Sequence, residues 1–202
     1  MENASVSSAQ LSQWSAEQFV IRTLNSSDVQ NVRALHTELV PSAPALRPAF
    51  FHQFLTHPTH LCLIATLPSS DKPVACIAVS VHVPTSDLTT KRTALPPVEV
   101  HVLALGVLPA FRRRGLATRL LYTATAHLRA LATKAPQLPS KHTTACSSTR
   151  IHSDVSRADS TARAFWKHVG LLEEEKVAPH YESWAGGWRD VVSVAGPIAS
   201  AA

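Results

Sequence analysis

The sequence has few cysteines, no long apolar run and no signal pattern at its start. Its 202 residues include three cysteines, an odd number whose spacing matches no metal-binding motif: Cys62, Cys76 and Cys146. We expect Cys62 and Cys76, which lie in apolar strand-like runs, to be small buried thiols rather than catalytic groups. No apolar run approaches the roughly 20 residues that span a bilayer, and the first residues lack the basic and apolar regions of a secretory signal. We therefore expect a cytoplasmic location and no membrane partner.

Charged residues are also few, at 16% of the chain, whereas hydrophobic residues make up 45%. These fractions are typical of a globular protein and exclude a disordered chain. The formal net charge of +5 fits contact with nucleic acid or the ribosome, but it fits a phosphate-bearing ligand equally well. Because no aromatic residues are interleaved with a basic stripe, we expect no specific nucleic-acid binding. The three arginines at 112–114 favour the phosphate-bearing ligand.

The apolar patterns predict an α/β fold. Alternating or continuous apolar runs predict strands at 19–24, 60–67, 73–81, 98–106 and 149–155, and a last extended pair or bent strand at 171–177 and 180–182. Helical periodicity and end signals predict helices at about 29–39, 48–55, 112–132 and 159–169. This order implies a mixed sheet covered by helices on both faces. We expect a flexible N-terminal arm at 1–16, one domain at 17–183 with inserts near 84–97 and 134–148, and a C-terminal tail at 184–202.

One turn carries the strongest functional signal. The segment from Val107 to Leu121 joins an apolar strand to an amphipathic helix through Arg112, Arg113, Arg114 and Gly115. The start of a helix offers unpaired N–H groups and the positive end of a dipole, and glycine lets the backbone approach a ligand closely. Arginines at this end oppose the dipole unless an anion is bound there. The turn therefore predicts a binding site for a diphosphate.

The spacing Arg112-x-x-Gly115-x-Ala117 resembles the acetyl-CoA signature of the GCN5-related N-acetyltransferase (GNAT) family. A second block, from Asp159 to Gly170, resembles another family segment, with Asp159 in place of the usual Asn and Trp166 in place of the usual Tyr. That Tyr is associated with protonation of the leaving thiolate, which an indole cannot perform. The resemblance implies a GNAT fold, with a mixed, mostly antiparallel central sheet flanked by helices on both faces. It implies acetyl-CoA as co-substrate and no metal. The implied cofactor-binding residues are Leu105, Gly106, Val107, Arg112, Arg113, Arg114, Gly115, Leu116, Ala117, Thr118, Asp159, Ala162 and Trp166.

The order and lengths of the segments from about Phe19 to Ser183 resemble the catalytic subunit of NatE, an N-terminal protein acetyltransferase. This resemblance implies transfer of acetyl to protein N-termini, with Met-starting ends preferred. It implies nascent chains as partners and raises a NatA-type auxiliary subunit and the ribosome as further ones. The residues implied to line the substrate pocket are Val40, Pro41, Leu103, His180 and Tyr181.

Two histidines are the predicted catalytic residues. An α-amino group has a pKa near 8, so a modest base such as His, acting directly or through water, is enough to keep it neutral for attack. By resemblance, His101 takes the place of a catalytic Tyr on the central strand, and His152 that of a His on the next strand. Two extra residues follow His152, which a β-bulge or register change would absorb, and Asp154, on the same strand face, is the competing candidate. The oxyanion donor is expected to be a backbone N–H near Leu105 or Val107.

Two other functions remain open from the sequence. The chain would also fit a GNAT enzyme that acetylates lysine side chains or a small amine. Replacement of Tyr by His101 and Trp166 leaves a third reading, in which the chain binds acetyl-CoA as a weakly active subunit of a ribosome-associated complex.

Overall fold

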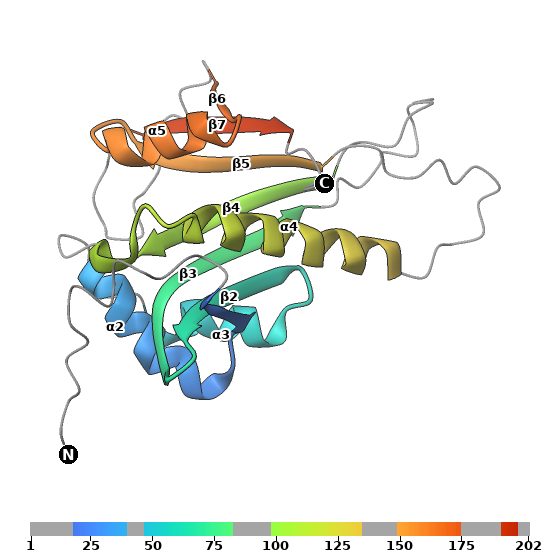
Figure 1. The fold of residues 1–202 in the computed structure, drawn as a ribbon. Helices are drawn as coiled ribbons and strands as arrows, with labels where there is room; N and C mark the ends of the chain where they lie inside the picture. The colour runs from blue at the N-terminus through green and yellow to red at the C-terminus, as the bar shows by residue number, and fades with distance from the viewer. Residues whose placement is uncertain (1–17, 40–46, 83–97, 135–148, 175–190, 198–202) are drawn as a thin grey trace.

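The structure is a computed structural model that describes residues 18–39, 47–82, 98–134, 149–174 and 191–197. Within these residues, seven strands form one sheet in the order β1-β2-β3-β4-β5-β7-β6, in which β4 and β5 are parallel and the other neighbouring pairs are antiparallel (Figure 1). The strands are β1 Val20–Thr23, β2 His60–Leu67, β3 Ser70–His82, β4 Val98–Val107, β5 Thr149–Ser156, β6 Leu172–Glu173 and β7 Val191–Pro197. The α-helices are α2 Val29–Leu39, α3 Pro48–Thr56, α4 Leu116–Lys134 and α5 Ser160–His168, and the short 3-10 helices are η2 Ser26–Asp28 and η3 Pro109–Phe111. The predicted mixed sheet of the GNAT fold is thus confirmed.

Helices cover both faces of the sheet, and each face has its own core (Figure 1). Alternate residues of β2 separate the two: Leu61 and Leu63 pack on the side of α4, whereas Cys62 and Ile64 pack on the side of α2 and α3. The thiols of Cys62 and Cys76 are free and buried, and burial raises the pKa of Cys76 to about 12. The prediction that these two thiols are buried is confirmed. None of the described helices combines the length and apolar character needed to cross a membrane.

Strand β4 contains a bulge at Leu103. Val79 of β3 pairs with Val102, and the preceding residue of β3, Ala78, pairs with Ala104, so Leu103 is the extra residue. The bulge interrupts the alternation of faces, because Leu103 and Ala104 both pack toward the core beneath α2 and α3. The parallel pairing of β4 with β5 runs from Val98 only as far as Val102. The second half of β4 therefore pairs with β3 on one edge and leaves β5 on the other.

Helix α4 begins at Leu116, four residues later than the periodicity predicts. The reason is backbone conformation: Arg113 has φ 61° and Gly115 has φ 75°, both in the left-handed region that interrupts a right-handed helix. The residues from Arg112 to Gly115 consequently form an irregular turn that precedes the helix.

The C-terminal part of the chain differs most from the prediction. Val191–Pro197 belongs to the predicted tail, yet it forms β7, which is hydrogen-bonded between β5 and β6. Val192 and Val194 are buried in the core on the α4 side. Packing of these alternate β-branched side chains against the core therefore stabilises the strand at this position in the sheet. Of the predicted extended segment at 171–177, Leu172–Glu173 forms β6, and 175–182 lies outside the described residues. So do the predicted arm and almost all of both inserts.

Candidate active site

The turn before α4 has the backbone of an anion-binding site. The carbonyl of Gly115 accepts the first helical hydrogen bond, from Arg119 N at 2.9 Å, so the N–H groups of the residues just after Gly115 precede the helical ladder. The first turn of α4 contains no acidic residue to satisfy them. The left-handed residues Arg113 and Gly115 reverse the direction of the backbone within the turn, and such turns can bring neighbouring N–H groups toward one point. An anion at this point would also be stabilised by the helix dipole.

The three arginines of the turn have different surroundings. Arg112 Nε donates to the carbonyl of Val107 at 2.9 Å. Arg114 Nη2 donates to the carbonyl of Ala110 at 3.0 Å, and its guanidinium lies 5.8 Å from the centre of the Phe111 ring. Arg113 is exposed and has no side-chain hydrogen bond or ion pair with the described part of the chain. Arg112 and Arg114 thus make hydrogen bonds within the turn, whereas all side-chain donors of Arg113 are available to a ligand as far as the described residues are concerned.

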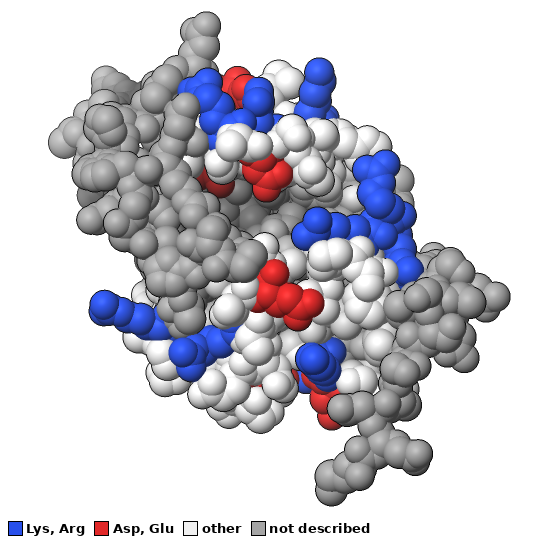
Figure 2. Space-filling model, turned by 90° about the vertical axis from the view of Figure 1, so that its left-hand side faces the viewer, with Lys and Arg blue, Asp and Glu red and all other residues white. Residues whose placement is uncertain are grey.

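Figure 2 views the molecule from the side on which α4 begins, and Lys and Arg side chains form a continuous group along one edge of this side. The other predicted residues of the helix start are less exposed: Leu116 is a core residue, and Ala117 and Thr118 are half-buried in the first turn. With Arg112 and Arg113 exposed and no acidic residue in the first turn of α4, the turn presents the positive charge that suits a diphosphate.

The second half of β4 directs backbone groups toward the gap beside β5. Leu108 N donates to the carbonyl of Val74 on β3 at 2.9 Å. Backbone groups alternate in direction along an antiparallel strand, so those of Val107 and Leu105 point away from β3. On that side β4 no longer pairs with β5. The N–H groups predicted as oxyanion donors thus face the gap.

The two predicted catalytic histidines lie side by side. His101 on β4 and His152 on β5 are direct partners in the parallel register, and their rings stack with centres 4.3 Å apart and an angle of 17° between planes. Asp154 lies next to them, with its Oδ2 3.5 Å from His101 Nε2. The neighbouring residues Val100 and Ile151 point to the core on the α4 side, so the three polar side chains lie on the opposite face.

Asp154 carries a negative charge in this cluster. The hydrogen bond from His101 lowers the pKa of the Asp154 carboxyl, and the charges of both histidines and a hydrogen bond from Ser193 act in the same direction, against the effect of burial. The side chains of His101 and Asp154 are each 17% exposed, so the pair is close to the surface but shielded from most water. Ser193 belongs to β7 and is the register partner of Asp154; no sequence motif indicated it.

Strand β5 pairs with β4 and β7 without a bulge or register shift, so the extra residues after His152 are not absorbed within the strand. His152 and Asp154 therefore keep regular alternation and share one face. The sequence left these two as competing candidates, and the structure brings both to His101.

The substrate-pocket residues are only partly described. Leu103 is half-buried at the bulge, whereas Val40, Pro41, His180 and Tyr181 lie outside the described residues. One contact locates the residue that precedes Val40: a Cβ on Gly106 would lie 2.3 Å from Leu39 Cδ1. Leu39 is the last residue of α2 and directly precedes Val40. Gly106 thus lets the end of α2 lie directly on the second half of β4.

Two residues of the second family block belong to α5: Asp159 is its N-cap, and Trp166 lies within the helix. Asp159 Oδ1 accepts a hydrogen bond from Ala162 N at 2.9 Å and caps the helix. Trp166 is 4% exposed in the core on the α4 side, so little of its ring surface is open to a ligand. Their predicted contacts with the cofactor remain predictions.

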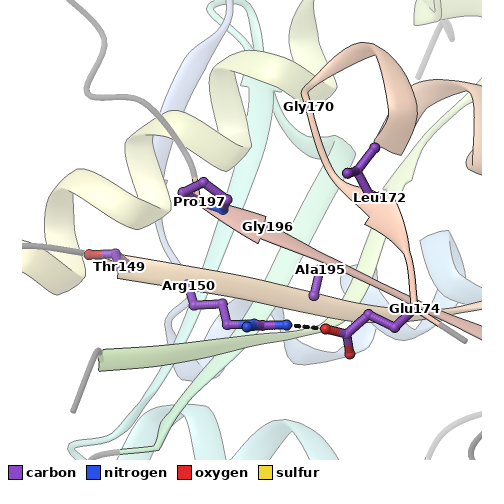
Figure 3. Close-up of a pocket in the computed structure, with 8 residues that line it drawn as sticks. All are labelled: Thr149, Arg150, Gly170, Leu172, Glu174, Ala195, Gly196 and Pro197. Carbon is purple, nitrogen blue, oxygen red and sulfur yellow. Dashed lines mark hydrogen bonds and ion pairs between the residues drawn. The ribbon is translucent and has the colours of Figure 1, made fainter. Parts of the chain in front are cut away.

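A cavity of about 430 Å³ lies at the β5–β7–β6 edge of the sheet (Figure 3). Arg150 of β5 and Glu174 form an ion pair in its wall. Ala195, another lining residue, is the register partner of His152. The cavity therefore begins next to the histidine cluster, on the side of β7. The described residues contain no group of three or more His, Cys, Asp or Glu side chains that could hold a metal ion.

The sequence profile of the acetyltransferase (GNAT) family matches residues 29–170. A comparison with curated proteins finds no match. Among solved structures, the chain is similar to NAA60 from Arabidopsis thaliana in complex with acetyl-CoA, with a TM-score of 0.64 and 16% identity over 89% of this chain and 98% of that one. It is similar to Naa50 from the same plant in complex with a bisubstrate analogue, with a TM-score of 0.57 and 16% identity over 89% and 98%. It is also similar to an aminoglycoside 6'-N-acetyltransferase from Acinetobacter baumannii, with a TM-score of 0.58 and 19% identity over 81% and 97%. These likenesses show the fold and do not distinguish among acceptors.

Proposed function

We propose, from the premise that the chain belongs to the acetyltransferase (GNAT) family, that it transfers the acetyl group of acetyl-CoA to the α-amino group of a protein or peptide N-terminus. The observation that carries this proposal is the contact of two imidazoles and a carboxylate beside the point where β4 leaves β5. Such a cluster can accept a proton from an amine that approaches the gap.

A histidine base suits an α-amine better than a lysine. An α-amino group has a pKa of about 8, so roughly a tenth of it is already neutral at pH 7, whereas a lysine amine near 10.4 is almost wholly protonated. A base with a pKa of about 6.5 can remove the remaining proton of the first but is a poor match for the second. We assign this role to His101 or His152, directly or through a water.

Acetyl-CoA supplies an acetyl group activated as a thioester. The groups that fit its diphosphate are the backbone N–H groups after Gly115 and the guanidinium of Arg113. They combine hydrogen-bond donors that have no partner within the helix with a positive charge. Arg112 and Arg114 hold the shape of the turn around it. The N–H groups of Leu105 and Val107, which point into the gap, are the donors for the oxyanion that forms during transfer.

The acceptor is proposed to lie between the end of α2 and the histidine cluster. The contact of Leu39 with Gly106 supports this position, because Val40 and Pro41 follow directly. Val40, Pro41, Leu103, His180 and Tyr181 remain the predicted pocket residues. The finer NatE-like features, a preference for Met-starting ends, nascent chains with an auxiliary subunit and the ribosome as partners, and a cytoplasmic location, are likewise proposals.

Three matched acceptors test the proposal: a peptide with a free N-terminus and no lysine, the same peptide N-terminally blocked with one internal lysine, and an aminoglycoside. Release of the CoA thiol and the mass of the product are measured. We expect turnover on the first peptide, reduced at least about 100-fold in His101→Ala with acetyl-CoA binding retained. Activity confined to the blocked peptide or to the aminoglycoside would reject the α-amine as acceptor. Micromolar acetyl-CoA binding with background turnover on all three acceptors would favour the alternative in which the chain is a weakly active, acetyl-CoA-binding subunit of a complex.

A further inference from the structure

We infer that Asp154, held from β7 by Ser193, is a positioning residue that fixes the tautomer of His101 and thereby makes His101, rather than His152, the base. The inference deepens the proposed function and rests on it for its catalytic meaning. Its geometric part concerns only how three strands arrange one imidazole.

The tautomer follows from the chemistry of the contact. A carboxylate has acceptor atoms only, so the nitrogen that faces it must carry the hydrogen. His101 Nε2 is the atom that faces Asp154 Oδ2, at 3.5 Å. A neutral imidazole has one donor and one acceptor nitrogen, which leaves the lone pair of His101 on Nδ1. A nearby carboxylate also stabilises the imidazolium that forms when the ring takes a proton.

The ring plane is set by a different residue. His152 stacks on His101 with ring centres 4.3 Å apart and nearly parallel planes. The two residues are also register partners on adjacent strands, so backbone hydrogen bonds set the separation of their Cα atoms. His152 therefore restricts rotation of the His101 ring, and Asp154 makes its hydrogen bond with His101.

Asp154 is itself held from the opposite side. Ser193 is its direct partner on β7 and hydrogen-bonds to it. The carbonyl of Ser193 accepts a hydrogen bond from Glu174 N at 2.8 Å, which fixes the strand that carries the hydroxyl. Residues from three strands, β4, β5 and β7, therefore hold the His101 imidazole in position. In the outer position, a hydroxyl that orients a carboxylate is expected to have a smaller effect than the carboxylate itself.

Few other charges face the cluster from the described residues. Glu99 precedes His101 by two positions on β4 and shares its face, and Arg150 does the same for His152 on β5. Arg150 forms an ion pair with Glu174, so these two charges largely cancel. Asp154, with its Oδ2 3.5 Å from His101 Nε2, is the carboxylate in contact with the imidazoles.

The test is the tautomer of His101 in the full-length protein, read from its ring nitrogens by NMR with ¹⁵N-labelled histidine. Signals are assigned with His101→Gln and His152→Gln. We expect a neutral ring protonated on Nε2 in the wild type, a mixture of tautomers in Asp154→Asn, and a smaller change in Ser193→Ala that Ser193→Thr reverses. Ser156→Ala, which removes a hydroxyl from the same face of β5 outside this cluster, is the control and should leave the tautomer unchanged. An unchanged His101 tautomer in Asp154→Asn would overturn the inference.

The kinetic readout separates positioning from structural damage. With the free peptide as acceptor, Asp154→Asn should lower kcat about 10-fold or more, alter the acidic limb of the kcat–pH profile, and leave the KM for acetyl-CoA unchanged. His152→Gln should keep the limb in place. If His152→Gln removes the limb and His101→Gln retains it, the assignment of the base is wrong. If the NMR change occurs but no α-amine is acetylated, the proposed function fails while the arrangement of His101 stands.

Discussion

Replacing Gly106 with alanine should destabilise the protein through a single contact. The new Cβ would lie 2.3 Å from Leu39 Cδ1 and 3.4 Å from Leu39 Cγ, whereas carbon atoms pack at roughly 3.5–4.0 Å. Leu39 Cδ1 must therefore withdraw by more than 1 Å, and because it is the free end of a half-buried side chain, rotation of that side chain can supply much of this movement. Overpacking of this kind costs about 1–3 kcal/mol. Because Gly106 does not have a positive φ, alanine also lowers the conformational entropy of the unfolded chain. This effect stabilises the folded state by about 0.4–1 kcal/mol. Since the Leu39 side chain can rotate, the overpacking cost lies toward the lower end of its range, and we expect a net loss of about 1 kcal/mol in the free energy of unfolding.

Urea unfolding followed by circular dichroism measures this loss, and thermal unfolding should show a decrease in Tm of roughly 2–4 °C for a chain of this size. The decisive variant is the double substitution with Leu39→Ala, which removes the atoms in the way. The double variant should be no less stable than Leu39→Ala alone, which corresponds to a coupling energy of about 1 kcal/mol or more.

Gly170→Ala is the matched control. Gly170 has φ 92° and no atom within 4 Å of its would-be Cβ, so alanine there is costly through backbone conformation alone. Its cost should add to that of Leu39→Ala without coupling. If Gly106→Ala is as stable as the wild type, or if Leu39→Ala fails to relieve it, α2 does not lie on β4 in the described way.

Three other perturbations test separate parts of the molecule. Arg113→Ala and Arg113→Gly should both weaken acetyl-CoA binding in calorimetry, but the glycine variant should be more stable than the alanine variant by about 1 kcal/mol, because residue 113 has φ 61°; equal stability would argue against the left-handed turn. Asp28→Asn should lower the free energy of unfolding at pH 7 by about 1–3 kcal/mol, since Asp28 is buried and accepts two hydrogen bonds from Arg22 at 2.5 and 2.8 Å. The hydrogen bonds from Arg22 lower the pKa of Asp28 below 3.8, so the wild-type advantage is present above pH 4 and declines as the pH falls through the lowered pKa; a difference that does not shrink as the pH is lowered below 3.8 would contradict this origin. Deletion of Leu103 should preserve the register of β4 with β3 but remove the bulge, and acetyl-CoA binding should be lost while the protein stays folded; retained binding would mean that the bulge does not open the gap.

Local patterns were sufficient for most of the fold. The predicted strand at 60–67 and helix at 48–55 match β2 and α3 to within one residue, because a continuous apolar run and a Pro-initiated amphipathic segment each specify their own conformation. The start of α4 could not be placed in the same way. Arginine is a good helix former, and nothing in its side chain indicates that residue 113 adopts a left-handed conformation, which depends on the fit of the whole turn.

Strand β7 shows the same limit over a longer range. Val191–Pro197 is short and follows a polar, glycine-containing stretch, and its place between β5 and β6 is set by pairing partners about 40 residues earlier in the sequence. The same limit applies to prediction of the candidate site. His101 and His152 could be selected because each matches a family position, but the contact of His101 with Asp154 needs the parallel register of two strands. Ser193 needs β7 as well and matches no motif.

The separation of β4 from β5 explains why the site combines side chains on hydrogen-bonded backbone with backbone N–H groups that have no partner strand. His101 and His152 form the second-last pair of the parallel ladder, and the last pair, Val102 and Ser153, is joined further by the Ser153 hydroxyl, which donates to the Val102 carbonyl at 3.1 Å. The imidazoles therefore sit on backbone that is hydrogen-bonded and in fixed register, which a proton-transfer group requires because its distance to the amine must be maintained. Leu105 and Val107 lie beyond the bulge, where the N–H groups toward β5 have no strand to pair with, and this is the property that an oxyanion donor requires. The single extra residue in β4 thus separates a rigid segment that carries the base from an unpaired segment that carries the donors.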